Sequence, residues 1–186
     1  ARAIEPEHME MLADQGATRE DLPIAFIHGE PILRATPGIV AEQLGLSYRG
    51  EADEVVDLVV VGGGPAGLAA AIYGASEGLS TVLLDAVAPG GQAASTSRIE
   101  NFLGFPYGVS GGDLIGQASL QALKFGVRVY APCEAIAIDR VGPGMLDVML
   151  ADGRPVRTRS VIVTSGAAYK SLNLDRWSDF ERSGIY

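Results

Sequence analysis

One stretch of this chain restricts its fold more than any other: an apolar run at residues 55–61 that ends in three glycines and leads into a helical pattern. The run is β-branched and apolar apart from Asp57, which is typical of a buried parallel strand. Gly62, Gly64 and Gly67 then match the spacing G-x-G-x-x-G, with a strand before it and a helix after it, as a dinucleotide site requires. The stretch therefore predicts a strand, turn and helix of the Rossmann type.

Each position of this turn has a mechanical role. Gly62 makes the tight turn, Gly64 lets the backbone approach a pyrophosphate, and Gly67 lets the helix pack on the strand. Pro65 suits the first helical turn, where its missing N–H removes no hydrogen bond, and the remaining N–H groups point toward an anion. Asp85 ends the second strand, roughly twenty residues on, where an acid binds a ribose 2′-OH. A carboxylate at this position favours an unphosphorylated ribose over a 2′-phosphate.

Composition narrows the class of partner. The net charge is −9 and no cluster of lysine and arginine stands out, which argues against nucleic acid or an anionic membrane. No run of about 18 apolar residues predicts a membrane span, and without a leader pattern we expect a cytoplasmic location. Cys133 is the single cysteine, which excludes an internal disulfide, and we expect it to be a buried structural thiol. His8 and His28 have no metal-ligand spacing around them, so we predict neither a metal site nor a catalytic side chain.

The N-terminal part of the chain has a pattern of its own. Leu22 and Pro23 precede two short apolar strands joined by a turn at residues 28–30, and a helix is expected at residues 37–44. This order resembles the second half of a thioredoxin or glutaredoxin domain, and the resemblance implies a cis peptide bond before Pro23. An unrelated hairpin and helix is the alternative. The polar, charged residues 47–54 predict a linker between domains.

The linker divides the chain into a thioredoxin-like segment, residues 1–50, and a second unit, residues 51–186. In the second unit we expect strands at residues 55–61, 80–85, 127–130, 135–139, 145–150, 156–158 and 161–163, and helices at residues 65–77 and 111–126. Tight turns predict that three of the later strands form an antiparallel meander beside a parallel sheet. The predicted fold class is therefore α/β, a Rossmann-type domain with a meander. The long connection at residues 87–110 is expected to be functional.

Four motifs then occur together in the second unit. They lie at residues 62–67 (GGGPAG), 89–92 (PGGQ), 99–106 (IENFLGFP) and 164–167 (TSGA). With these motifs, residues from about 55 to 186 resemble the flavin-binding half of a thioredoxin reductase-like pyridine nucleotide-disulfide oxidoreductase. The resemblance implies an enzyme that passes electrons from NADPH through FAD to a disulfide, on thioredoxin or a similar acceptor, and it is compatible with a homodimer.

The same resemblance implies which residues contact FAD. The pyrophosphate would lie on Gly64, Pro65 and Ala66, and the ribose on Asp85. Other predicted contacts are Gly91, Gln92 and Asn101 at the ribityl chain and isoalloxazine, Ala135 at the adenine, and Thr164, Gly166 and Ala167 beside the dinucleotide.

Parts of such an enzyme have no counterpart in these residues. The resemblance implies an NADPH domain, a redox cysteine pair and a closing flavin segment, so we expect the chain to be a fragment that is inactive alone. No general acid, base or nucleophile is identifiable, because in a flavoenzyme the cofactor carries the chemistry. Two alternatives stay open: a flavin oxidase of the same fold, and a non-catalytic dinucleotide-binding or sensor module.

Overall fold

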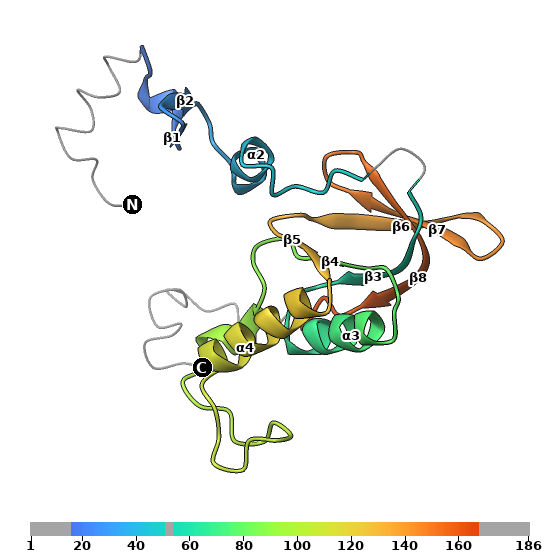
Figure 1. The fold of residues 1–186 in the computed structure, drawn as a ribbon. Helices are drawn as coiled ribbons and strands as arrows, with labels where there is room; N and C mark the ends of the chain where they lie inside the picture. The colour runs from blue at the N-terminus through green and yellow to red at the C-terminus, as the bar shows by residue number, and fades with distance from the viewer. Residues whose placement is uncertain (1–15, 51–53, 168–186) are drawn as a thin grey trace, which may run out of the picture.

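The computed structural model of the chain describes residues 16–50 and 54–167, and in these residues a six-stranded mixed sheet carries two helices on one face (Figure 1). The strand order is β5-β4-β3-β8-β7-β6. The strands are β3 (Val56–Val61), β4 (Thr81–Leu84), β5 (Arg128–Tyr130), β6 (Ala135–Gly142), β7 (Met145–Leu150) and β8 (Pro155–Val163). The helices are α3 (Pro65–Ser76) and α4 (Gly111–Lys124), with a 3-10 turn, η2 (Gly91–Ser95), between β4 and α4. The predicted α/β class with a parallel sheet and an antiparallel meander is confirmed.

Strand β3 lies at the centre of the sheet because it is apolar on both faces. It pairs in parallel with β4 on one side and with β8 on the other, with Val60 opposite both Leu83 and Ile162. Val60 packs toward α3 and α4, together with Leu68 of α3. Val59 packs in a second cluster on the opposite face of the sheet. Burial on both faces is what a nearly continuous run of valine and leucine predicts.

One prediction about the strands is wrong. Residues 156–158 and 161–163, expected as two strands, belong to the single strand β8. Thr158 is the position where β8 changes partner: it lies opposite Leu146 of β7 in antiparallel register and opposite Val56 of β3 in parallel register. Buried and exposed side chains alternate only as far as Arg159, but the pairing with β3 continues at Ser160 and Val161, so the strand is not interrupted. The meander and the parallel sheet are therefore one continuous surface.

The N-terminal segment forms a hairpin and a helix, as expected. Strands β1 (Ala25–Ile27) and β2 (Glu30–Ile32) pair in antiparallel register across His28 and Gly29, which both have positive φ. After a short 3-10 turn, η1 (Arg19–Asp21), the peptide bond before Pro23 is cis, as the resemblance implied. Helix α2 (Pro37–Gln43) begins at Thr36, whose hydroxyl accepts a hydrogen bond from the Ile39 N–H at 3.3 Å. Among the helices that the structure describes, none is long and apolar enough to cross a membrane.

The predicted linker is partly packed on the sheet. Tyr48 is 3% exposed and lies edge to face on Tyr130 of β5, with ring centroids 5.1 Å apart. Its hydroxyl donates to Glu54, which also forms an ion pair of 2.7 Å with Arg128. Burial and the neighbouring Glu54 carboxylate raise the pKa of Tyr48 to about 12. A tyrosine in a charged stretch thus fastens the N-terminal segment to the sheet.

Candidate dinucleotide site

A cavity of about 270 Å³ lies where the chain leaves the carboxyl ends of β3, β4 and β8. Strands β4 and β8 flank β3 on opposite sides, so the cavity lies at the point where the strand order reverses, which is the usual ligand position in an open α/β sheet. Its lining consists of Gly62, Gly64, Pro65, Ala66, Asp85, Gly91, Gln92, Ala93, Thr164, Ser165, Gly166 and Ala167. Ten of the thirteen residues predicted to contact the cofactor are in this lining.

The N-terminus of α3 supplies the anion-binding part of the cavity. Gly64 is its N-cap and makes no side-chain hydrogen bond to the helix, so the first N–H groups of α3 are left for a ligand. Pro65, at the first helical position, has no N–H to satisfy. A Cβ added to Gly64 would meet no atom within 4 Å, which shows that the space above this residue is open. The site therefore fits a pyrophosphate, which needs close approach of backbone and a positive helix end.

Gly62 and Gly67 are required by packing. Gly62 has φ +104°, and a Cβ there would overlap the Thr164 carbonyl. A Cβ on Gly67 would overlap the Gly62 carbonyl and lie 2.7 Å from Thr164 Oγ1. The Thr164 hydroxyl lies 2.8 Å from the Gly62 carbonyl oxygen, to which it donates. Gly67 is buried and lies outside the lining, so its role is the close packing of α3 on β3 that the motif predicts, not direct contact.

Asp85 has a role that the sequence did not reveal. Its Oδ2 accepts a hydrogen bond from the Gly63 N–H at 2.7 Å, and its Oδ1 accepts from the Val87 and Ala88 N–H groups at 2.9 Å each. The carboxylate therefore joins the glycine turn to the loop after β4. A carboxylate has about four lone-pair positions, so acceptor capacity remains for a ribose hydroxyl.

The loop after β4 closes the cavity from the other side. The side-chain amide of Gln92 donates to the Ala167 carbonyl at 2.9 Å, which connects η2 to the turn after β8. The Gly90 N–H donates to the Gly63 carbonyl at 2.7 Å and holds the start of this loop on the glycine turn. Ser165 lies in the turn at residues 164–167 that was predicted to pass beside the dinucleotide, whereas Ala93, which lines the cavity beside Gln92, was missed by sequence reasoning. The small size of Ala93 beside a predicted contact residue was the available signal.

Two predicted contact residues are not brought to this cavity. Asn101 is exposed because the loop that carries it folds back, with Phe102 and Phe105 lining a groove against α3 and α4. Ala135 begins β6 and pairs with Leu150 in the ladder with β7. The three residues before Ala135 line a separate cavity, as described below. Neither Asn101 nor Ala135 lines the first cavity, and their contacts with FAD stay predictions.

The side chains that line the cavity can contact a ligand, but they do not form a catalytic arrangement of an acid, a base and a nucleophile. Asp85 is the one titratable side chain among the residues that line it. Within the part of the chain that the structure describes, no group of three or more His, Cys, Asp or Glu residues could hold a metal ion. Cys133, the free thiol, is buried, and burial raises its pKa. None of the side chains that line this cavity is redox-active.

Comparisons with known proteins agree with this geometry. Residues 56–182 match the sequence profile of the pyridine nucleotide-disulphide oxidoreductase family. The chain is 35% identical over 135 residues to NADPH-dependent thioredoxin reductase 3 from Arabidopsis thaliana, covering 70% of this chain and 25% of that protein. It is 33% identical over 133 residues to the thioredoxin reductase of Streptomyces clavuligerus, covering 71% and 41%. The crystal structure of T. acidophilum thioredoxin reductase matches with a TM-score of 0.61 at 30% identity, over 69% of this chain and 41% of that one. The chain thus spans between a quarter and about two fifths of the length of these relatives.

Proposed function

The chain belongs to the pyridine nucleotide-disulphide oxidoreductase family, and from that premise we propose that residues 56–167 hold the FAD of an enzyme that reduces a disulfide with electrons from NADPH. FAD and NADPH are the cofactors of this family. Thioredoxin is the proposed acceptor, because the relatives are named thioredoxin reductases. We also propose that the chain is divided into a thioredoxin-like segment, residues 1–50, and a flavin-binding unit, residues 51–186.

One observation carries the proposal: an uncapped helix N-terminus, a strand-terminal carboxylate and a turn of small residues open into the same cavity. The pyrophosphate of FAD would lie on the N–H groups around Gly64 and Ala66, and a ribose would lie beside Asp85. Gly91, Gln92 and the turn at residues 164–167 would form the opposite wall. Bound FAD supplies the hydride and electron transfer, and these residues bind and orient it.

Anaerobic reduction of the purified full-length protein tests the proposed activity. We expect NADPH to bleach the flavin absorbance and oxidised thioredoxin to restore it without oxygen. Reoxidation by oxygen alone, with no response to thioredoxin, would indicate the oxidase alternative. A protein whose flavin NADPH does not reduce would fit the non-catalytic module.

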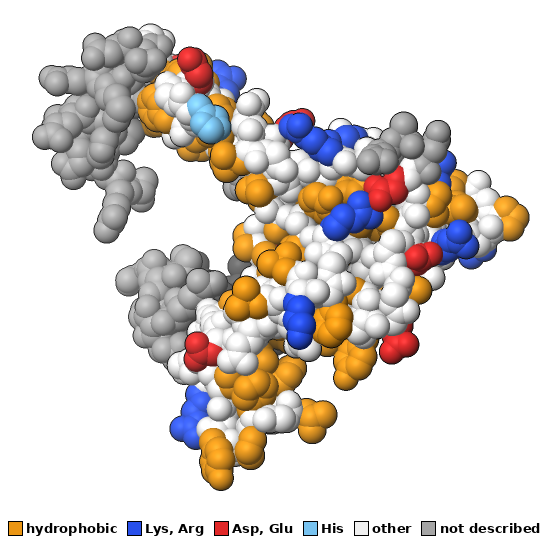
Figure 2. Space-filling view, in the orientation of Figure 1, with side chains coloured by type: hydrophobic (Ala, Val, Ile, Leu, Met, Phe, Trp, Pro, Cys, Tyr) orange, Lys and Arg blue, Asp and Glu red, His pale blue; other side chains and the backbone are white. Residues whose placement is uncertain are grey.

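We further propose that two copies of the protein associate through the α3 and α4 face. Figure 2 shows hydrophobic side chains gathered over the loop that hangs below α4 in Figure 1. Leu103, Tyr107, Leu120 and Leu123 are all at least 60% exposed. Apolar surface of this kind marks protein–protein contacts. A dimer in sedimentation that Leu120→Glu converts to a monomer would support the proposal. We propose the cytoplasm as the compartment of the protein.

A further inference from the structure

A second cavity, of about 440 Å³, lies next to the first and is lined on one side by the N-terminal segment. Asp85 lines the first cavity and Ala86, the next residue, lines the second. The Cys133 N–H donates to the Asp85 carbonyl at 2.6 Å, which ties the second cavity's wall to the end of β4. The two cavities are therefore lined by consecutive residues at the end of β4.

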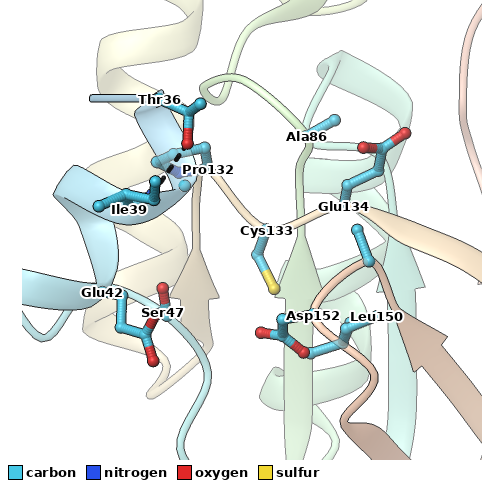
Figure 3. Close-up of a pocket in the computed structure, with 12 residues that line it drawn as sticks. Thr36, Ile39, Glu42, Ser47, Ala86, Pro132, Cys133, Glu134, Leu150 and Asp152 are labelled. Atoms are coloured by element: carbon cyan, nitrogen blue, oxygen red, sulfur yellow. Dashed lines mark hydrogen bonds between the residues drawn. The ribbon is translucent and has the colours of Figure 1, made fainter. Parts of the chain in front are cut away.

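Helix α2 and the residues after it form one wall of the second cavity. Figure 3 shows Thr36, Ile39, Glu42 and Ser47 on one side, facing Cys133, Glu134, Leu150 and Asp152 on the other. The four residues on the α2 side all precede residue 56, where the match to the family begins. Ile39 is 40% exposed, so its apolar side chain is available to a ligand. The family-matched residues alone would leave this cavity open on one side.

The charges of the two cavities differ. The first presents a helix N-terminus and suits an anion. The second presents the carboxylates of Glu42 and Glu134, while Asp152 is paired with Arg154 through Oδ2 and the Arg154 Nε at 3.0 Å. Burial raises the pKa of the Cys133 thiol, which keeps it neutral. Carboxylates repel phosphate and accept hydrogen bonds from amino groups, so this cavity suits a neutral base with an amino donor.

The apolar surface of the second cavity suits a flat ring. Ile39, Pro132, Leu150 and Ala151 contribute it from both sides of the cavity. A volume of about 440 Å³ is within the range of small-ligand sites. With the pyrophosphate on α3 and a ribose at Asp85, the adenine of an extended dinucleotide is the group that reaches Ala86.

The resemblance places the adenine of FAD at this end of the sheet, and we propose that α2 is the outer wall around it, so that the N-terminal segment is part of the cofactor site. This inference rests on the proposed function, since it takes FAD as the ligand. Ile39 is then a binding residue that lies outside the family-matched part of the chain.

Binding by the full-length protein freed of flavin tests the proposal, with FAD, ADP and inorganic pyrophosphate as probes in calorimetry. Ile39→Glu replaces an apolar contact with the base by a charge that binding would take out of water, and it is expected to weaken FAD and ADP by about tenfold or more. Pyrophosphate binding should stay unchanged, because pyrophosphate does not reach this cavity. Gln43→Glu, on the same helix outside the lining, adds the same charge and should leave all three affinities unchanged.

Hydrogen exchange gives a second readout that needs no variant. ADP and FAD, but not pyrophosphate, should slow amide exchange in residues 36–47. Wild-type affinity of Ile39→Glu for FAD and ADP, with unchanged exchange in residues 36–47, would overturn the inference and leave the proposed function standing. A wild-type protein that binds neither FAD nor ADP would overturn both.

Discussion

The carboxylate of Asp85 and the backbone N–H of Gly63 are joined by a hydrogen bond of 2.7 Å that spans 22 residues of sequence. The bond connects the end of β4 to the middle of the glycine turn after β3. Because the same carboxylate also accepts from the Val87 and Ala88 N–H groups, it shapes both loops of the site before any ribose is bound. The acid of this motif is a structural residue as well as a predicted ribose ligand.

Replacing Asp85 by asparagine tests this double role. The amide has one acceptor oxygen and one donor NH₂ group, so at least one of the three backbone N–H groups loses its partner. We expect Asp85→Asn to lower the free energy of unfolding by about 1–3 kcal/mol, measured by denaturant unfolding. We also expect it to weaken FAD binding. Glu30→Gln, an exposed change on β2, is the control and should alter neither quantity.

Gly67→Ala tests the packing of α3 on β3. The added methyl would overlap the Gly62 carbonyl and crowd the Thr164 hydroxyl, so α3 has to move away from the sheet. We expect a loss of about 3 kcal/mol in the free energy of unfolding. Gly116→Ala makes the same change in α4, where a Cβ meets nothing within 4 Å, and should stabilise the protein by about 0.5–1 kcal/mol. Equal stabilities of the two variants would contradict the packing described.

Acid pH should selectively weaken the pairing of Asp147 with Arg157. Asp147 is 6% exposed, and its hydrogen bonds from the Arg157 guanidinium lower its pKa from the ordinary value of an aspartate. A carboxyl with a lowered pKa contributes stability that is fully present above its unfolded pKa and is lost as pH falls through the folded one. We expect Asp147→Asn to cost about 1 kcal/mol at neutral pH, with the difference from wild type vanishing in acid. Glu30→Gln, on β2, should show no such trend; a constant deficit for Asp147→Asn at all pH values would contradict the assignment.

Much of the fold and of the first cavity could be predicted because the determining signals are local. A strand that ends in glycines at a fixed spacing, with an acid after the next strand, specifies Gly62, Gly64 and Asp85 without knowledge of distant residues. The turn at residues 164–167 could also be predicted from its small residues, since a turn beside a dinucleotide has no room for large side chains.

What sequence reasoning missed depends on contacts between distant segments. Tyr48 lies in a charged stretch, and its burial depends on Tyr130, which is 82 positions away. Thr158 changes partner within one strand because β3 and β7 are both in reach, and no local pattern marks that position. Asn101 was placed by resemblance, but the packing of Phe102 and Phe105 decides where its loop lies.

Gly64→Val separates binding from folding. A Cβ on Gly64 meets nothing within 4 Å in the protein, and its φ of −69° is open to any L-residue, so the variant should fold with near wild-type stability. Its side chain would project into the space proposed for the pyrophosphate, so FAD should be lost from the purified protein. We expect the variant to have a free energy of unfolding close to that of wild type and to contain no flavin after purification. Unaltered flavin content would count against the proposed position of the pyrophosphate.

The flavin content of the purified full-length protein is the most direct test of the proposed cofactor site. We expect about one FAD per chain, retained through purification and released on denaturation as FAD and not as FMN. A folded, colourless protein that takes up no FAD on reconstitution would contradict the assignment of the cavity beside Gly64 and Asp85.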